Sequence, residues 1–174
     1  AIFKDNCELA KARELGIPCV ERSIMLGEVC RLFPKSICVS GTHGKTTTTS
    51  MCTHIFMAAQ ADPTVMIGGT LPLLHSGYRV GQGDTIILES CEYCDSFLNF
   101  FPTLAVILNV EADHLDYFKD LHDVQKSFKA FAQLATGSVL ANGDDLHTAQ
   151  ALRGTKYVSF GLGEKNRVRA VNIT

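Results

Sequence analysis

Residues 36–49 read SICVSGTHGKTTTT, and this stretch decides the fold that we expect. The segment SICVSG is short, apolar and rich in β-forming residues, THGK is a loop with a glycine, and the residues from Gly44 to about Gln60 have the pattern of a long helix. A strand, a loop and a helix in this order are the context of a phosphate-binding loop, whose backbone N–H groups converge on phosphate oxygens at the start of the helix. The sequence therefore predicts an α/β unit that binds a nucleotide.

The loop departs from the usual template G-x-x-x-x-G-K-[ST], because Val39 stands where the template has its first glycine. Gly41 and Gly44 still allow the backbone to approach a phosphate closely, and Val39 then belongs to the strand. In such a loop Lys45 binds the β- and γ-phosphates, and the hydroxyl of Thr46 binds Mg²⁺. The alternative is an ordinary strand-to-helix turn with a solvated lysine.

Acidic residues and a histidine follow two further apolar segments. Glu89 stands where the apolar part of the segment TIILES runs out, and LAVILN is followed by VEADHLD, which contains Glu111, Asp113, His114 and Asp116. Parallel strands end at one edge of a sheet, where ligands of open α/β sheets bind, so Glu89 is a candidate ligand of Mg²⁺. His114 is a second candidate, with a hydrogen-bonded structural histidine as the alternative. The other three acids could equally be helix caps or solvated charges.

Short apolar segments alternate with helical patterns along the rest of the chain. This alternation predicts an α/β fold with a mostly parallel sheet flanked by helices. Besides SICVSG, the expected strands are PTVMIG, TIILES, LAVILN, SVLAN, KYVSFG and VRAVNI. The expected helices are residues 5–15, residues 23–32 and the amphipathic segment 121–134, with an extended piece at 17–20. We expect the boundary between a leading fragment and this domain at Pro34 and Lys35.

Composition excludes several classes of function. The 174 residues are 46% hydrophobic and 20% charged, and the formal net charge of −2 does not favour a nucleic-acid or membrane surface. No apolar run approaches the ~18 residues that a membrane span needs. Because the chain has neither an initiator Met nor a signal peptide, we expect it to be part of a longer protein.

Cysteine usage points to a reducing compartment. Seven cysteines are an odd number, and they lie in apolar segments, so we expect reduced, buried thiols in a cytosolic protein and no disulfide. Cys91 and Cys94 form a C-x-x-C pair, but no second pair and no histidine stands at zinc spacing from them. We therefore expect no zinc at this pair.

Three motifs occur in a specific order: GTHGKTTTTSM, ESCEYCDSFL and NVEADHLDYF. Together they resemble the central ATPase domain of the Mur ligases, and the resemblance extends from Ala1 to Thr174. The family's loop is G-T-x-G-K-T, which accounts for the missing glycine. The resemblance implies a cytoplasmic, ATP-dependent amide ligase of peptidoglycan synthesis, and hence a part in cell wall biogenesis, cell shape and cell division. The most similar branch joins L-alanine to UDP-N-acetylmuramate through an acyl phosphate.

The resemblance also implies roles for individual residues. Lys45 and two Mg²⁺ ions would neutralise the phosphates and the substrate carboxylate; Thr46 and Glu89 would hold the metal that bridges the phosphates. His114 would ligate the second metal beside the acyl acceptor. The residues that would cradle ATP are Gly41, Thr42, His43, Gly44, Lys45, Thr46 and Thr47. Taken from the residues alone, His43 could instead cap the loop, and Thr47 could satisfy backbone groups at the helix start.

Three further positions each have a structural explanation beside a functional one. The stretch IGGT at 67–70 resembles a loop that reaches toward the sugar-nucleotide, but its glycines could equally serve a turn. Cys94 stands where relatives commonly have Arg. Lys129 lies at the spacing from His114 that a carbamoylated lysine has in sister ligases, but a surface lysine on an amphipathic helix explains it as well. We leave Lys129 out of the site.

The family has three domains, and the resemblance covers only part of them. Residues 1–34 would be the tail of the N-terminal UDP-substrate domain and residues 35–174 the central ATP-binding domain, with the C-terminal ligase domain absent. The chain alone should therefore be inactive. The alternatives are another ligase of the superfamily, of the muropeptide-recycling or folylpolyglutamate type, or a non-catalytic nucleotide-binding module. The intact set of Lys45, Thr46, Glu89 and His114 argues against the last.

Overall fold

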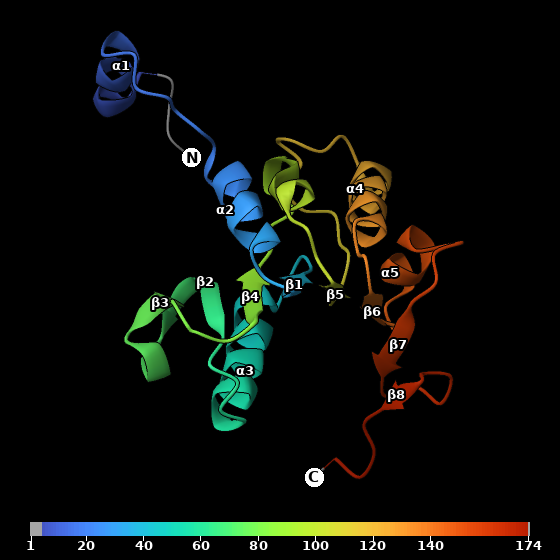
Figure 1. The fold of residues 1–174 in the computed structure, drawn as a ribbon. Helices are drawn as coiled ribbons and strands as arrows, with labels where there is room; N and C mark the ends of the chain where they lie inside the picture. Colours follow the sequence, from blue (N-terminus) through green and yellow to red (C-terminus); the bar gives the residue numbers. More distant parts are fainter. Residues whose placement is uncertain (1–4, 174) are drawn as a thin grey trace.

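A computed structural model describes residues 5–173, which form one eight-stranded sheet (Figure 1). The strand order is β3-β2-β4-β1-β5-β6-β7-β8, and every neighbouring pair is parallel except β2 and β3. The strands are β1 (Lys35–Ser40), β2 (Thr64–Leu71), β3 (Ser76–Arg79), β4 (Thr85–Glu89), β5 (Leu104–Ile107), β6 (Ser138–Asn142), β7 (Val158–Gly161) and β8 (Val168–Arg169). The mostly parallel α/β sheet that the apolar segments predict is confirmed.

Helices cover both faces of this sheet. The helical elements are α1 (Cys7–Glu14), α2 (Arg22–Arg31), α3 (Lys45–Ala58), η1 (Pro72–Leu74), η2 (Tyr93–Asn99), α4 (Leu121–Gln133) and α5 (Leu146–Ala151). In Figure 1, α3 lies on one side of the sheet, while α2, η2, α4 and α5 lie on the other. The expected helices are therefore present, with ends within a few residues of the predicted ones.

Strand β4 separates the two cores of the molecule. Ile86 and Leu88 belong to the larger core, which also contains aromatic residues of η2 and α4. Ile87 points to the opposite face and packs in the smaller core, next to Cys52 and Phe56 of α3. Side chains that alternate between two covered faces make a strand apolar throughout, which explains the uniformly apolar pattern of TIILES.

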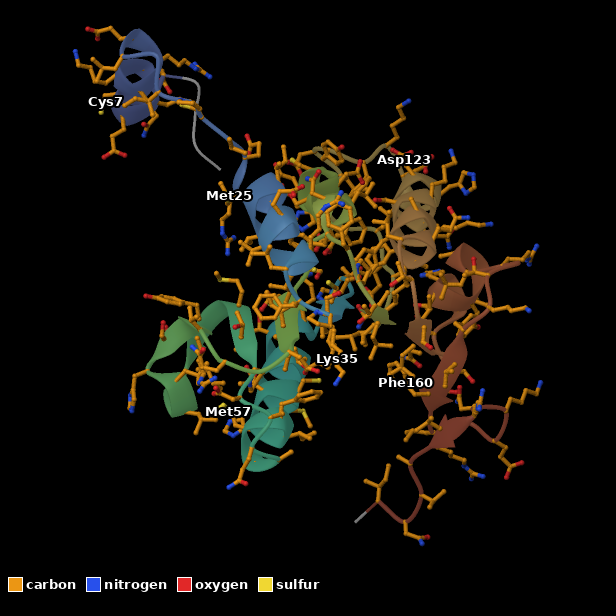
Figure 2. The ribbon with its side chains drawn as sticks, in the orientation of Figure 1. Cys7, Met25, Lys35, Met57, Asp123 and Phe160 are labelled. Atoms are coloured by element: carbon orange, nitrogen blue, oxygen red, sulfur yellow. The ribbon has the colours of Figure 1, made fainter. Side chains whose placement is uncertain are left out.

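Helix α1 stands apart from the sheet. Asn6 caps it by accepting hydrogen bonds from the backbone of Glu8 and Leu9, but none of its residues is buried. Figure 2 shows Cys7 on this helix, away from the side chains that surround the sheet. Residues 17–20 form no strand, and the polypeptide enters the sheet only at Lys35.

Besides the single turn η1, three elements have no counterpart in the sequence-based prediction. Strand β3 turns back after η1 and pairs antiparallel with β2. Its four residues SGYR are too few and too polar to give a strand pattern, so the pairing with β2 determines it. Helix α5 has only six residues, below the length at which helical periodicity can be recognised. In the third element, η2, Cys94 and Asp95 have positive φ angles.

The expectation that all the cysteines are buried is wrong for four of them. Cys30 and Cys38 are buried, and Cys52 is half-buried, whereas the exposed ones are Cys7, Cys19, Cys91 and Cys94. All seven are free thiols. The odd number of cysteines indicated free thiols. The sequence did not show which of them would lie on the exposed surface, because their exposure depends on how the segments pack.

No helix within residues 5–173 is both long enough and apolar enough to cross a membrane.

Candidate functional site

The glycine loop between β1 and α3 needs glycine at two positions. Gly41 has φ of 147°, and a Cβ there would lie 2.9 Å from Cβ of Leu108. Gly44, the residue before α3, is left-handed with φ of 82°. Residues with a side chain rarely adopt either conformation. The loop therefore turns sharply between the strand and the helix, with the start of α3 at its open end.

The segment after β5 holds this loop in place. The side chain of Asn109 accepts a hydrogen bond from the backbone N–H of His43 at 2.7 Å and donates one to the His43 carbonyl at 3.0 Å. The backbone N–H of Glu111 donates to Oγ1 of Thr42 at 2.8 Å. The sequence predicted only that Asn109 ends a strand, and its role as a clamp on the loop was missed.

Lys45 lies over the loop with its ammonium group fully engaged. Nζ donates to the carbonyls of Gly41 at 2.6 Å and Thr42 at 3.2 Å. It also contacts both carboxylate oxygens of Glu92, at 2.9 and 3.2 Å. Only 13% of the Lys45 side chain is exposed, so the alternative of a solvated lysine in an ordinary turn is wrong.

Glu92 is the site residue that the sequence did not reveal. Its side chain is 2% exposed, and besides Lys45 it faces His114, with Oε1 4.0 Å from Nε2. A buried carboxylate is costly unless a cation or several donors satisfy it, so its position is a strong sign of function or of a structural ion pair. The only sequence signal was its place in the motif ESCEYCDSFL.

Thr46 and Glu89 form a second pair of polar groups beside Lys45. Oγ1 of Thr46 donates to Oε1 of Glu89 at 3.0 Å, and the backbone N–H of Gly68 donates to Oε2 at 2.7 Å. A Cβ on Gly68 would lie 2.6 Å from Oε1, so this glycine makes room for the carboxylate. The hydroxyl at the start of α3 and the carboxylate at the end of β4 are oxygen donors of the kind that Mg²⁺ takes together with phosphate and water oxygens. The two residues therefore fit a magnesium ion.

His114 is held in a tight turn against Tyr93. Its φ is 53°, its carbonyl accepts hydrogen bonds from the N–H groups of Tyr117 and Phe118, and its ring lies 4.7 Å from that of Tyr93. The Tyr93 hydroxyl donates to Oδ2 of Asp116 at 2.8 Å. This hydrogen bond raises the pKa of Tyr93 to about 12, because the carboxylate favours the protonated phenol. Asp116 thus fixes the ring that packs on His114.

A hydrogen bond from a second tyrosine joins the same two segments. The Tyr117 hydroxyl donates to Oδ2 of Asp95 at 2.7 Å, and Oγ of Ser127 donates to Oδ1. The hydrogen bond to Asp95 raises the pKa of Tyr117 to about 12. Cys94 and Asp95 both have positive φ, a strained backbone that persists only where surrounding contacts impose it.

The structure thus brings the predicted residues together in two groups. Thr46 lies with Glu89, while Lys45 and His114 both lie next to Glu92. The groups adjoin because Lys45 and Thr46 are successive residues at the start of α3. Among residues 5–173, no cluster of three or more His, Cys, Asp or Glu side chains is arranged to hold a metal ion, and this holds for Cys91 and Cys94 too.

The remaining candidate residues have weaker contacts. His43 lies 3.6 Å from Glu111 with both side chains largely exposed, and Thr47 is exposed at the start of α3. Thr49 is buried, and its hydroxyl donates to the carbonyl of Lys45 at 2.8 Å, the structural role that hydroxyls near a helix start favour. Lys129 donates to the carbonyl of Arg153 at 3.0 Å on the surface, in agreement with its exclusion from the site.

Comparison with known proteins places this geometry in a family. The model of the Mur ligase middle domain matches residues 39–174. A UDP-N-acetylmuramate–L-alanine ligase of Acetivibrio thermocellus is 46% identical over 95% of this chain, and one of Caldanaerobacter subterraneus is 44% identical over all of it. The chain spans 36% and 39% of the lengths of these two relatives.

Two solved structures are similar in fold and in sequence. The UDP-N-acetylmuramate–alanine ligase of Thermotoga maritima superposes with a TM-score of 0.81 at 29% identity, over 92% of this chain and 37% of that one. A UDP-N-acetylmuramate:L-alanyl-γ-D-glutamyl-meso-diaminopimelate ligase from Neisseria meningitides gives a TM-score of 0.79 at 26% identity, over 92% of this chain and 56% of that one.

Proposed function

Because the chain belongs to the Mur ligase family, through the middle domain of that family, we propose that it is the ATP-binding part of a ligase that joins L-alanine to UDP-N-acetylmuramate. The observation that carries the proposal is the placement of Lys45 between the glycine loop and a buried carboxylate, beside the Thr46–Glu89 pair. Identity of 44–46% to relatives named for this reaction supports the choice of substrates.

The glycine loop would bind the phosphates of ATP. The loop leads directly into the start of α3, where the helix dipole favours negative charge. Lys45 would bond the β- and γ-phosphates, and Thr46 with Glu89 would hold Mg²⁺. The ion would supply electrostatic neutralisation of the phosphates, which lets an anionic acceptor approach them.

The reaction would proceed in two steps. A carboxylate oxygen of the acceptor would attack the γ-phosphorus, and the bond between the γ-phosphorus and the oxygen that bridges it to the β-phosphate would break. The products are ADP and the acyl phosphate of the acceptor. The neutral amine of L-alanine would then attack the acyl carbon and form a tetrahedral intermediate. The nitrogen would lose a proton to solvent, and the bond from carbon to the phosphate oxygen would break, which gives the amide and inorganic phosphate. His114, at the same edge of the sheet, would serve the acceptor side of this centre.

The domain assignment belongs to the same proposal. Residues 1–34 would be the end of a UDP-substrate domain, and residues 35–174 would lie within the central ATP-binding domain. Helix α1, which buries no residue, and β1, which begins at Lys35, support this division. The reaction uses a nucleotide-linked precursor and ATP, so the proposed location is the cytoplasm.

A ligase that adds a whole tripeptide is the second candidate. The Neisseria structure, named for the L-alanyl-γ-D-glutamyl-meso-diaminopimelate substrate, has a TM-score only slightly below that of the alanine ligase. The fold therefore favours neither substrate, and sequence identity alone favours alanine.

The test uses the protein expressed from its complete gene. Phosphate release is followed with ATP, Mg²⁺ and UDP-N-acetylmuramate, adding either L-alanine or the tripeptide, and the amide product is identified by mass spectrometry. We expect product with L-alanine and none with the tripeptide. Product with the tripeptide alone would favour the second candidate, and no ATP-dependent product with either amine would contradict both.

A further inference from the structure

Residues 109–111 follow β5 and lie between the glycine loop and helix α5. Toward the loop, Asn109 accepts hydrogen bonds from the backbone N–H groups of Thr42 at 3.1 Å and His43 at 2.7 Å. The Asn109 side chain also donates to the His43 carbonyl, and the N–H of Glu111 donates to Oγ1 of Thr42. Because of these four hydrogen bonds, the position of the loop depends on the position of residues 109–111.

Helix α5 binds the residue between these two. Val110 is fully buried, and its backbone N–H donates to Oδ2 of Asp145 at 3.2 Å. The Val110 carbonyl lies 3.1 Å from Nδ1 of His147. A carbonyl oxygen only accepts hydrogen bonds, so Nδ1 of His147 carries the hydrogen in this contact. Both backbone polar groups of Val110 are therefore satisfied by side chains of one short helix and its cap.

The two side chains of α5 are themselves held by their neighbours. Oδ2 of Asp145 also accepts hydrogen bonds from the N–H and the hydroxyl of Thr148, and so caps the helix. The side chain of Gln125, on α4, donates to the carbonyl of His147 at 3.3 Å. A group that is fixed by such contacts can hold another group in a defined place. Helix α5 thus provides a rigid support for Val110.

We infer that Asp145 and His147 are positioning residues for nucleotide binding, although residues 109–111 separate them from the glycine loop. They fix the backbone of Val110, and its two neighbours fix the loop that would hold the phosphates. Without the contacts from α5, residues 109–111 can shift and the loop shifts with them, so phosphate binding loses its preorganised geometry. This inference rests on the proposed nucleotide site and extends it to a helix that supplies no group to the phosphates.

Two substitutions of similar size separate the hydrogen bond from packing. His147→Leu removes the donor, whereas His147→Asn keeps an N–H at the same number of bonds from Cα as Nδ1. Both are made in the protein expressed from its complete gene, and isothermal calorimetry measures binding of Mg·ATP. We expect His147→Leu to weaken binding about fivefold, the effect of one lost hydrogen bond, and His147→Asn to restore most of the affinity.

Amide hydrogen exchange without nucleotide shows whether the loop itself responds. In His147→Leu, the peptide that covers residues 40–46 should exchange about fivefold faster than in the wild type, while the peptide that covers β4 keeps its rate. His147→Asn should exchange like the wild type. His122→Ala is the matched control, because it removes an exposed histidine from α4 and should change neither exchange nor affinity.

Several outcomes would overturn the inference. If His147→Leu binds Mg·ATP as tightly as the wild type, or if His147→Asn is as weak as His147→Leu, the hydrogen bond to Val110 does not position the loop. Equally faster exchange in the loop and in β4 would mean that His147 only stabilises the fold. If His147→Leu does not fold, His147→Phe keeps a ring, removes the donor and carries the same expectations.

Failure of the inference and failure of the proposed function give different results. A wild type that binds no ATP would contradict the proposed function. The exchange of the loop peptide would still decide whether α5 positions the loop, because that measurement needs no nucleotide.

Discussion

Gly68 decides where the Glu89 carboxylate lies. The residue donates its N–H to Oε2, and any Cβ would stand 2.6 Å from Oε1 and 3.0 Å from Cδ. Such distances are far inside van der Waals contact, so a side chain at this position must push the carboxylate away from Thr46. The space that the Glu89 carboxylate requires thus explains the glycine at position 68 of IGGT, without any contact to a sugar-nucleotide.

We predict that Gly68→Ala weakens binding of Mg·ATP roughly tenfold, about 1.4 kcal/mol, because Glu89 no longer reaches the ion beside Thr46. Gly69→Ala is the matched control, since a Cβ there meets Thr46 Cγ2 at an ordinary 3.5 Å. Isothermal calorimetry with ATP in the presence and absence of Mg²⁺ provides the measurement. Equal effects of the two substitutions would show that the carboxylate is not the group affected.

The tyrosines of the site predict how stability changes in alkali. Hydrogen bonds to Asp116 and Asp95 raise the pKa of Tyr93 and Tyr117 to about 12, above the ordinary value of about 10. A group whose pKa is raised by folding contributes stability that is complete below the unfolded pKa and is lost as pH rises through the folded one. The contribution is therefore full below about pH 10 and lost between about pH 10 and 12.

We expect the urea midpoint of the wild type to fall between pH 9 and pH 11.5 by more than that of Tyr93→Phe, which has no phenol to ionise. Tyr78→Phe is the control, because Tyr78 is an exposed tyrosine of β3, outside the site. If the two variants and the wild type lose stability in parallel, the hydrogen bond of Tyr93 to Asp116 does not contribute to folding.

At the scale of elements, η2 begins directly after Glu92 and is fixed by its packing on α4. Phe97 is fully buried, stacked on Phe131 with ring centroids 4.6 Å apart, and edge-on to Phe128 at 5.3 Å. Its side chain therefore anchors the segment that starts at Glu92 to the helix that covers β5. The position of the buried carboxylate depends on this aromatic contact.

Phe97→Ala should lower the free energy of unfolding by about 3–5 kcal/mol, the usual cost of emptying a buried aromatic position. Ile55→Ala removes an exposed aliphatic side chain from α3 and should change stability by no more than about 0.5 kcal/mol. Urea unfolding followed by circular dichroism measures both. A loss at Phe97 as small as that at Ile55 would mean that η2 is not anchored by its core contact.

At the scale of the whole molecule, the chain spans 36% and 39% of the two relatives compared above. Residues 35–58 contain the complete glycine loop and its helix, but the proposed reaction also requires two substrates to be held in attack geometry. Correct positioning of reactants can supply ~7–11 kcal/mol of a barrier. Binding of the phosphates and positioning of the two substrates can therefore depend on different parts of the protein.

We therefore predict that residues 1–174 alone bind ATP weakly and form no amide, while slow ATP hydrolysis persists because water needs no binding site. Phosphate release and mass spectrometry of the products, with UDP-N-acetylmuramate and L-alanine present, measure both activities. Amide formation at an ordinary enzymatic rate by these residues alone would contradict the division into domains.

The succession of strands and helices along the chain could be predicted from sequence because it depends on local patterns. Strand β1, the glycine loop and α3 are contiguous, and their apolar run, glycines and helix signal act over a few residues. Uniformly apolar strands likewise indicated a sheet covered on both faces. Strand β3 and helix α5 were missed because they are short, and their partners rather than their own residues determine them.

The contacts that make a site of these residues depend on tertiary structure. Lys45 and Glu92 are 47 positions apart, and His43 and Asn109 are 66 apart. They meet because β4 and β5 both pair with β1 in parallel, so that three chain segments leave the sheet at the same edge. The sequence by itself determined which chemical groups are present and that they follow strand ends. Only the fold decided that Glu89 lies with Thr46 while Glu92 is buried between Lys45 and His114, because burial and charge pairing arise from segments that are distant along the chain.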